Sequence, residues 1–522
     1  MRPSRTPLLL LVTLACAGAC SADEDTVVNP DVEEVDDTPD LEDLEWLDGG
    51  DWIDDALDDA TAPVDAAPGL DAPAPRDVPT ARDAGMDALA DASRDAVAFV
   101  DAPAPRDVPA PPVDAGFAFP TPIHHVVVLV RENRTFDNLF TGFPGAETTT
   151  FGVRSTGAHV PLRLAPDGDL PGDIRHSHPG AIMAFAGGAM NGFDRNAQLH
   201  SDTGNPLGPF VHYAEAQIPN YWQYARRYVL ADHFFSTALT CSSPGHFAFW
   251  TAQTPIIDNP DCTGTLCGNG SGCFAPRSTV TTLNQATCAV RSSTAAPCLD
   301  VPTVVDAFPS ALTWRVYAEP NANANGIVSS PLAMARGITR NRAAYMAHMG
   351  AQSTLIPDLE AGRQANLVVA HVGGAAGEHP PAGLCAGENF AVRVVNAVMR
   401  GPHWNDTSIL LTYDDWGGFY DHVRPPQERC SNGDHVHLGF RLPLIVVSPY
   451  ARRSNDPAHP YVFHGVTEQS SVPRLVEDLF RLPRMSARDA NARDGRAGSL
   501  LGVFDFAHPD ATPMILPTRT CP

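Results

Sequence analysis

The stretch HVVVLVRENRTFD, residues 125–137, decides the fold class of this chain. It opens with a continuous apolar run and changes at position 131 to the polar residues Arg131-Glu132-Asn133. A run without polar alternation is typical of a strand that is covered on both faces, as in a parallel sheet flanked by helices. The polar residues that follow are therefore expected at the carboxyl end of a buried strand.

The same pattern recurs further along the chain. Apolar runs at 367–370, 408–413 and 442–447 predict more buried strands, and helical patterns lie between them at 219–231, 387–400 and 470–482. Strands that alternate with helices predict an α/β sandwich with a mostly parallel sheet. In such sheets, ligands bind beyond the carboxyl ends of the strands. That rule places a site beside four polar residues, namely Glu132, Asn133, Asp414 and Asp415.

The amino-terminal segment 1–20 has the features of an export signal. Two arginines precede an apolar stretch, Leu8–Leu14, which is too short to span a bilayer. Small residues directly before Cys20 resemble a bacterial lipoprotein processing site, which would leave Cys20 as an acylated first residue. The alternative is cleavage nearby without a lipid. We expect an exported protein, either anchored in the cell envelope through a lipid on Cys20 or extracellular.

Residues 21–115 carry nearly all of the net charge of −26, with 28 Asp and Glu against four Arg. The segment is rich in Asp, Pro and Ala, and the nonamer DAPAPRDVP occurs in it at 71–79 and again at 101–109. Such a composition buries too little apolar surface to offset the entropy of ordering, which predicts a disordered, extended linker. The remainder is only mildly acidic and offers no clustered positive charge for nucleic acid.

Lysine is absent from the sequence, which excludes lysine-based phosphate loops and Schiff bases. Nine cysteines follow the leader, and five of them lie between 262 and 298. In an exported protein this spacing favours a disulfide-stapled insertion, here 258–300. Zinc binding by Cys262 and Cys267 is the alternative. Because nine is odd, at least one thiol is free or pairs between chains.

Two adjacent carboxylates, Asp414 and Asp415, end a predicted buried strand, where they repel each other and lose hydration. A cation between them would remove both problems. With Glu132 and Asn133 they would form an all-oxygen shell, which suits one hard or borderline divalent metal ion of unknown identity. The alternative is a solvated turn that caps a helix.

Small hydroxyl residues precede Pro-Gly in TCSSPGH, residues 240–246. A serine on a tight turn that opens a helix could attack phosphorus while amide groups hold the phosphate. Histidines at 176, 379 and 422 could hold a phosphate oxygen or protonate a leaving alkoxide. Each feature alone also fits an ordinary loop or a structural hydrogen bond.

In this order, the blocks resemble the phosphoesterase family that includes bacterial phospholipases C and acid phosphatase A. Residues 125–137 resemble its opening block, and LTYDDWGGFYDHV, 411–423, resembles its most specific block. Residues 440–451 and 471–477 are similar to its carboxyl-terminal blocks. The resemblance covers about 123 to 490.

The resemblance implies an alkaline-phosphatase-like α/β/α fold. It also implies a metal held by Glu132, Asn133, Asp414 and Asp415. The family nucleophile stands two residues before a proline, a position that Ser242 holds here. The family histidines that contact phosphate or the leaving group correspond to His176 and His379, and less clearly to His422. The chain departs from the family at Gly245 and Asn191, where Asn and Asp are usual.

These observations predict a phosphoesterase catalytic domain over 120–515. The expected activity is that of a phospholipase C-type phosphodiesterase with a serine nucleophile, a phosphoenzyme intermediate and a phospholipid substrate. Two alternatives stay open, namely a broad acid phosphomonoesterase and a catalytically inactive envelope protein that binds phosphate ligands.

Overall fold

The structure is a computed structural model that describes residues 118–260, 272–274, 278–319 and 330–522, except for positions 434 and 457. The predicted export signal, Cys20 and the predicted linker 21–115 lie outside these residues, as do Cys262 and Cys267. Among the helices that the structure describes, none combines the length and the apolar character that a membrane span requires.

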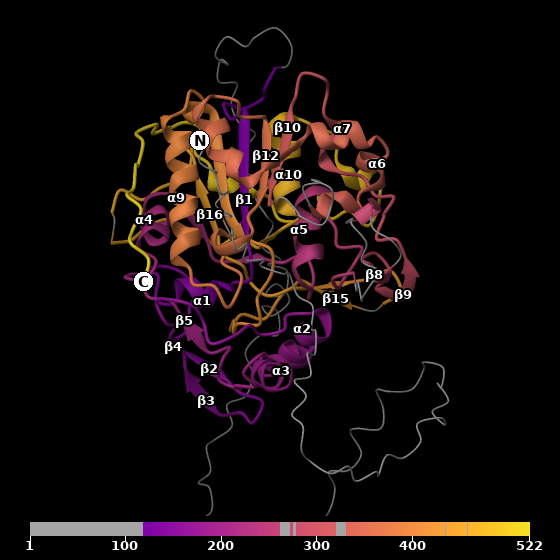
Figure 1. Ribbon diagram of the computed structural model, residues 1–522, viewed down its shortest axis with the longest axis vertical. Coiled ribbons are helices and arrows are strands. Elements are labelled where there is room, and N and C mark those ends of the chain that lie inside the picture. The colour runs from indigo at the N-terminus through magenta and orange to yellow at the C-terminus, as the bar shows by residue number, and fades with distance from the viewer. Residues whose placement is uncertain (1–117, 261–271, 275–277, 320–329, 434, 457) are drawn as a thin grey trace, which may run out of the picture. The chain divides into compact units, whose positions relative to one another are not determined.

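An eight-stranded sheet forms the centre of the fold (Figure 1). Its strands, in spatial order, are β11 (Met349–Ala351), β10 (Trp314–Ala318), β12 (Leu367–His371), β1 (His125–Arg131), β13 (Thr407–Tyr413), β16 (Leu444–Val447), β6 (Val229–Ala231) and β17 (Val462–Phe463). Within this sheet only β16 is antiparallel to its neighbours. The predicted mostly parallel sheet is therefore confirmed.

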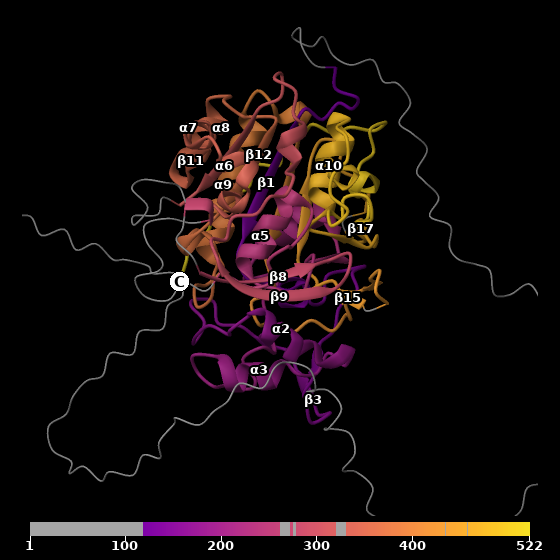
Figure 2. The ribbon, with the colours of Figure 1, turned by 90° about the vertical axis from the view of Figure 1, so that its right-hand side faces the viewer.

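Helices cover both faces of the sheet. On one side lie α4 (Pro219–Arg227) and α9 (Cys385–Arg400), and on the other lie α5 (Ser242–Thr251) and α10 (Ser471–Phe480), as Figures 1 and 2 show together. The predicted α/β sandwich of three layers is thus confirmed. The remaining helices are α1 (Phe136–Phe140), α2 (His178–Phe185), α3 (Phe193–His200), α6 (Arg336–Thr339), α7 (Arg342–Ala347) and α8 (Leu355–Glu360).

Short strands pair outside the main sheet. The pairs are β2 (Phe151–Val153) with β3 (His159–Pro161), β4 (Arg163–Leu164) with β5 (Val211–His212), β7 (Phe234–Phe235) with β18 (Thr467–Glu468), β8 (Ser278–Asn284) with β9 (Ala289–Ala295), and β14 (Gln427–Arg429) with β15 (His435–His437). Strands β2 to β5 and helices α1 to α3 lie below the carboxyl end of β1 in Figure 1, beside the edge where the polar residues follow.

The helix predicted over 219–231 is confirmed up to Arg227 and wrong over its last four residues. Helix α4 ends at Arg227, and the next three apolar residues, Val229–Ala231, form strand β6. They pair with β16 on one side and β17 on the other, so the sheet offers them hydrogen bonds and burial that a continued helix would not. The helices predicted at 387–400 and 470–482 are present with slightly shifted ends.

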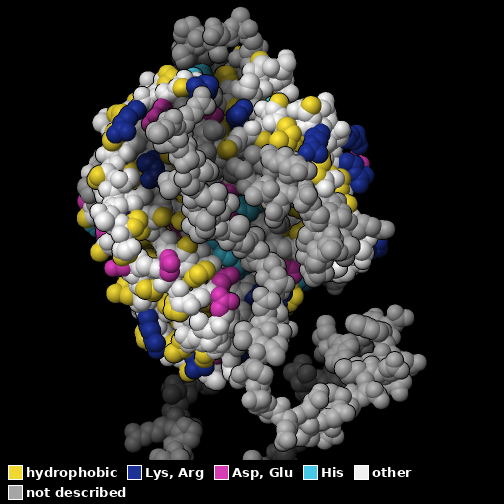
Figure 3. All heavy atoms as spheres, viewed as in Figure 1, with side chains coloured by type: hydrophobic (Ala, Val, Ile, Leu, Met, Phe, Trp, Pro, Cys, Tyr) yellow, Lys and Arg dark blue, Asp and Glu magenta, His cyan; other side chains and the backbone are white. Residues whose placement is uncertain are grey.

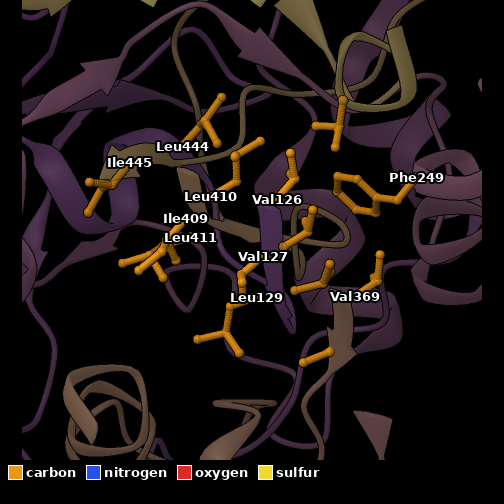
Figure 4. Packing of buried hydrophobic residues seen from close by; sticks show 14 of the residues in the cluster. Val126, Val127, Leu129, Phe249, Val369, Ile409, Leu410, Leu411, Leu444 and Ile445 are labelled. Carbon is orange, nitrogen blue, oxygen red and sulfur yellow. The ribbon is translucent and has the colours of Figure 1, made fainter. Parts of the chain in front are cut away.

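The apolar runs of the sequence form the core, which Figure 4 shows close up. In β1, the five side chains from Val126 to Val130 are fully buried. Burial of each contributes roughly 1.5–3 kcal/mol relative to an exposed side chain. This burial on both faces explains why the run carries no polar alternation.

A second, smaller apolar cluster joins α2 and α3 to the segment after β13. Phe193 contacts Trp416 and Tyr420 edge to face at ring distances of 5.8 and 5.0 Å. The indole of Trp416 also donates a hydrogen bond of 3.2 Å to the carbonyl of His176. This cluster therefore fixes the segment that carries His176 next to the segment that follows Asp415.

Three disulfides are present among the described residues, and they include the region where the sequence predicts them. Cys273–Cys298 lies within the predicted insertion, and Cys288–Cys430 joins its β8–β9 hairpin to the region of β14. Cys385–Cys521 ties the carboxyl terminus to the start of α9. Cys241 is a free, buried thiol.

Candidate active site

Two strand ends bring the four predicted metal ligands together. Strands β1 and β13 are adjacent and parallel, with Arg131 opposite Tyr413, so the residues that follow both strands emerge at the same edge. The backbone N–H of Asn133 donates to Asp414 Oδ1 across this edge at 2.9 Å. Asn133, Asp414 and Asp415 are fully buried, whereas Glu132 is partly exposed.

Helix α5 places the predicted nucleophile against this carboxylate pair. The helix begins at Ser242, whose hydroxyl donates a hydrogen bond of 3.0 Å to Asp415 Oδ2. Three residues later the helix passes directly over the backbone that follows β13. A Cβ at Gly245 would lie 2.2 Å from the carbonyl oxygen of Asp414. A glycine is required here because the backbones approach so closely.

This contact gives a first prediction. Gly245→Ala would force the start of α5 away from Asp414, because the clash is with backbone and no side chain can move aside. A displacement of about 1 Å at reacting groups can lower a rate by about 10²-fold. We expect a loss of that order in kcat, measured on a chromogenic phosphate ester. Gly168→Ala, where a Cβ meets no atom within 4 Å, is the control and should leave kcat unchanged.

In both predicted histidines near the carboxylates, a backbone carbonyl fixes which ring nitrogen carries the hydrogen. His176 Nδ1 lies 2.8 Å from the carbonyl of Ile174, and His379 Nδ1 lies 2.6 Å from the carbonyl of Pro380. A carbonyl oxygen only accepts, so Nδ1 carries the hydrogen in each ring and Nε2 is the nitrogen that gains or loses a proton. Both Nε2 atoms face the Asn133 amide, at 2.9 Å for His379 and 3.2 Å for His176.

The side chain of Asn133 lies between these two rings and Asp415. With its amide nitrogen toward Asp415, the nitrogen donates to the two carboxylate oxygens at 3.2 and 3.3 Å. The amide oxygen then faces Nε2 of both rings and accepts a hydrogen bond from either ring when that nitrogen carries a proton.

The loop that carries His379 rests on a buried polar network. Glu378, the preceding residue, has a left-handed backbone with φ of 69° and is fully buried. Its carboxylate accepts hydrogen bonds of 2.5 Å from the hydroxyls of Tyr221 and Tyr413. The guanidinium of Arg131 lies over both tyrosine rings, at 4.6 and 4.7 Å. These contacts hold a strained turn in place, which presents His379 to the site.

Without a cation, ionisation of Asp415 and Glu132 is unfavourable. Burial and the neighbouring charge of Asp414 raise the pKa of Asp415 to about 8, and they raise the pKa of Glu132 well above its usual range. For Asp414, burial acts in the same direction, but the contact with His246, the N–H of Asn133 and the charge of His176 together outweigh it and lower the pKa. Burial alone would lower the pKa of His176, and the charges of Asp415 and Asp173 raise it instead.

The charges and lone pairs of the site suit a divalent cation. Asp414 Oδ2 is buried and faces His246 Nε2 at 3.3 Å. A carboxylate oxygen has two lone pairs, so Oδ2 keeps one for a cation, beside three acidic groups that repel one another. Oxygen ligands of this kind suit a divalent ion. The donor set fits the expected metal.

The raised pKa values predict how pH affects the stability of metal-free protein. Between about pH 4 and 8, folded Asp415 keeps a proton that the unfolded chain has released, so stability falls as pH rises through this window. The raised pKa of His176 likewise makes the folded protein less stable as pH rises. One such proton corresponds to at most about 1.4 kcal/mol per pH unit.

A divalent cation should oppose this trend, because it replaces the proton and binds more tightly as pH rises. Thermal melts from pH 5 to 8 should therefore show the largest rise in Tm on adding cation at pH 8. Asp421 and Glu477, whose pKa values are also raised, affect both curves equally. Parallel curves with and without cation would contradict the assignment.

Sequence reasoning missed a buried chain of rings behind Asp414. The indole of Trp250 donates to His371 Nε2 at 3.1 Å, so His371 Nδ1 carries the proton and faces His246 Nδ1 at 2.8 Å. His246 Nε2 is then left with the hydrogen and lies 3.3 Å from Asp414 Oδ2. Burial holds the pKa of His371 well below its usual range, which keeps this ring neutral.

This chain of rings orients the carboxylate of Asp414 from inside the core. One signal was available in the sequence, since His246 and Trp250 stand four and eight residues after Ser242 and share a face of its helix. His371, the last residue of β12, could not be assigned without the pairing of β12 with β1.

The structure places His422 in a different cluster. Its Nδ1 contacts Asp137 Oδ2 at 2.6 Å, and its Nε2 lies 3.7 Å from Glu147. Arg441 pairs with both Asp137 and Asp421 in the same cluster, at 3.1 and 2.9 Å. Among the contacts recorded for the described residues, those of His422 are to this group, while His176 and His379 accompany Ser242.

The site is open to solvent on one side. Ser242, Glu132 and His379 are each partly exposed, above the buried residues Asn133, Asp414 and Asp415. On the face shown in Figure 3, histidine and acidic side chains come to the surface together near the middle of the described part. The partly exposed Ser242 therefore links the solvent-facing side of the site to the buried carboxylates through its hydrogen bond with Asp415.

Comparison with known proteins gives one family match and several curated relatives. The model of the Phosphoesterase family matches residues 123–483. Phospholipase C A of Mycobacterium tuberculosis is 25% identical over 448 residues, which cover 74% of this chain and 78% of that protein. Non-specific phospholipase C1 of Arabidopsis thaliana is 31% identical over 141 residues, or 24% of this chain and 26% of that protein.

Solved structures show only distant likeness. A protein in the alkaline phosphatase superfamily from Vibrio parahaemolyticus aligns with a TM-score of 0.28 and 10% identity, over 69% of this chain and 66% of that chain.

Proposed function

Since the chain belongs to the phosphoesterase family, and is thus a hydrolase of phosphate esters, we propose that it uses Ser242 as a nucleophile beside a divalent metal ion. The observation that carries this proposal is the hydrogen bond of 3.0 Å between the Ser242 hydroxyl and Asp415, at the meeting point of two strand ends. The expected metal ligands are Glu132, Asn133, Asp414 and Asp415.

The neighbours of Ser242 are less suited to attack phosphorus. Thr240 is fully buried and donates its hydroxyl to the carbonyl of Ile257 at 2.6 Å. Cys241 is buried and lies 3.1 Å from Asp258, and burial raises its thiol pKa well above the usual range, so it stays protonated. Ser242 alone among these three has a partly exposed hydroxyl in contact with the carboxylate pair.

A bound divalent cation would neutralise phosphate charge and lower the pKa of the attacking hydroxyl. The hydroxyl proton of Ser242 points to Asp415 Oδ2, which accepts it when Oγ bonds to phosphorus. Ser242 stands at the start of α5, where the helix dipole favours the incoming negative charge.

The leaving oxygen then needs a proton. His379 supplies it from Nε2 while Nδ1 keeps its hydrogen on the Pro380 carbonyl, so the ring enters this step as imidazolium and leaves it neutral. His176 holds a phosphate oxygen on the other side of the same amide. A water molecule next attacks the phosphoserine and gives a proton to His379, while Asp415 returns its proton to the departing Ser242 oxygen.

We propose phospholipid headgroups as the main substrates, which makes the protein a phospholipase C-type phosphodiesterase. Curated relatives that match over most of this chain carry phospholipase C names. A broad phosphomonoesterase would use the same residues on a smaller leaving group. Three disulfides in the described residues agree with an exported protein. We further propose a catalytic domain over 120–515, an export signal over 1–20 and a lipid on Cys20.

One assay tests the proposal and separates the alternatives. Phosphatidylcholine vesicles, a chromogenic phosphodiester and a chromogenic phosphomonoester are compared at equal concentration, with and without chelator. We expect the highest kcat/KM on the phospholipid and loss of all turnover with chelator. Faster hydrolysis of the monoester would favour an acid phosphatase. No hydrolysis of any of the three would support the inactive binding protein.

A further inference from the structure

A second cluster of metal-ligating side chains lies at the other edge of the sheet, where β1 and β13 begin. His125 is the first residue of β1, and His403 and Asp406 belong to the short turn that precedes β13. One nitrogen or oxygen of each lies within 4.8 Å of those of the other two. The seven residues of β1 separate this cluster from the active site by roughly 20 Å.

His125 has the arrangement of a histidine prepared to bind metal. Its Nδ1 lies 3.0 Å from the carbonyl of Ala365, so Nδ1 carries the hydrogen and Nε2 keeps its lone pair. Metal-binding histidines usually donate their other ring nitrogen to a carbonyl in this way. The residue is 8% exposed, and burial lowers its pKa to about 4, so the ring is neutral at pH 7.

One carboxylate oxygen of Asp406 contacts a histidine, and the other has no hydrogen-bond partner among the described residues. His124 Nδ1 lies 3.2 Å from its Oδ2. Its Oδ1 is shielded from solvent and has no hydrogen-bond partner among the described residues. Within the cluster, His403 Nδ1 lies 3.9 Å from this Oδ1, which is too far for a hydrogen bond. Two ligands of one zinc ion, each about 2.0–2.1 Å from it, lie roughly 3–3.5 Å apart, so this gap needs little adjustment to hold a cation.

The ring of His403 completes the group. Its centroid lies 4.2 Å from that of His125, with the two planes tilted by 46°. His403 is one-third exposed, which leaves a path for an ion and for a water ligand. Strand pairing keeps the two segments together, because His125 lies opposite Thr407 in the register of β1 and β13.

The described residues contain two other groups of His and Asp side chains, but their carboxylates already have hydrogen-bond or ion-pair partners. In the first, both carboxylate oxygens of Asp232 already accept hydrogen bonds, from the rings of His233 and His464 and from the backbone of Glu147. In the second, Arg441 supplies the positive charge between Asp137 and Asp421.

We propose that His125, His403 and Asp406 bind a borderline divalent cation of the Zn²⁺ type, with water as a fourth ligand. Two imidazoles and one carboxylate match the ligand preference of such ions. The ion would fasten the turn at 403–406 to the start of β1 and take no part in hydrolysis. The site is therefore separate from the metal expected beside Ser242.

The test measures zinc bound per chain. Full-length protein is stripped with chelator, equilibrated with Zn²⁺ and dialysed, and its metal content is determined by inductively coupled plasma mass spectrometry. The variants are His403→Ala and Asp406→Asn, the second of which keeps the shape of the side chain and its contact with His124. The control is His508→Ala, since His508 and Asp505 form a pair at the same spacing without a third ligand.

We expect each of the two variants to lose one zinc equivalent relative to the wild type and the control to lose none. Hydrolysis of the phosphate ester should stay within about twofold of wild type in all three, which separates this site from the catalytic one. Circular dichroism shows whether each variant is folded. Unchanged zinc content in folded Asp406→Asn, an equal loss in the control, or loss of hydrolysis together with the zinc would each overturn the proposal.

Discussion

Replacing Ser242 by alanine is expected to lower kcat by about 10⁴-fold or more, while the fold stays intact. The alanine removes the oxygen that would bond to phosphorus and also the hydrogen bond to Asp415. The position is partly exposed at a helix start, so no core contact is lost. Hydrolysis of a chromogenic phosphate ester measures the effect, and a thermal melt checks the fold.

The neighbouring residue provides a matched control for this variant. Ser243 lies one position further along α5, and its recorded contact is from its backbone N–H to Asn259. Ser243→Ala should therefore keep kcat within about threefold of the wild type. If Ser242→Ala retained full activity and Ser243→Ala did not, the nucleophile would have to be reassigned.

Asp415→Asn should lower kcat by about 10³-fold or more and remove the catalytic metal. The change keeps the shape of the side chain but removes a charge that faces Ser242 at 3.0 Å and His176 at 3.8 Å. It also removes the proton acceptor proposed for the attack. We expect the variant to be more stable than the metal-free wild type at pH 8, because a costly buried charge is gone.

Metal content and stability separate this outcome from simple unfolding. Metal analysis should show one equivalent fewer in Asp415→Asn, and a urea melt should show a folded protein. Asp505→Asn, in an exposed turn, serves as the control with unchanged metal and rate. A variant that kept both its metal and its rate would contradict the role assigned to Asp415.

The sequence predicts the frame of the site well, because strand ends in a parallel sheet have few possible positions. The polar residues after 131 and after 413 could be placed together once both apolar runs were interpreted as buried strands of one sheet. The register of β1 with β13 confirms that they emerge side by side. The strand at 229–231 was missed because three apolar residues that continue a helical pattern give no separate signal.

Long-range contacts could not be predicted from local patterns. His371 stands behind His246 only because β12 pairs with β1, and Glu378 meets two tyrosines from distant segments. The grouping of His422 with Arg441 rather than with Ser242 likewise depends on how the segment after β13 folds back. In each case the partners are more than a dozen residues apart, so neither spacing nor composition carries the information.

The stereochemical course at phosphorus tests most directly whether a serine ester lies on the reaction path. A phosphorothioate diester of one configuration is hydrolysed in isotopically labelled water, and the configuration of the product is determined. Each in-line displacement inverts phosphorus, so attack by Ser242 followed by attack of water predicts net retention. Net inversion would show that water attacks the substrate directly, which would contradict a serine nucleophile in this protein.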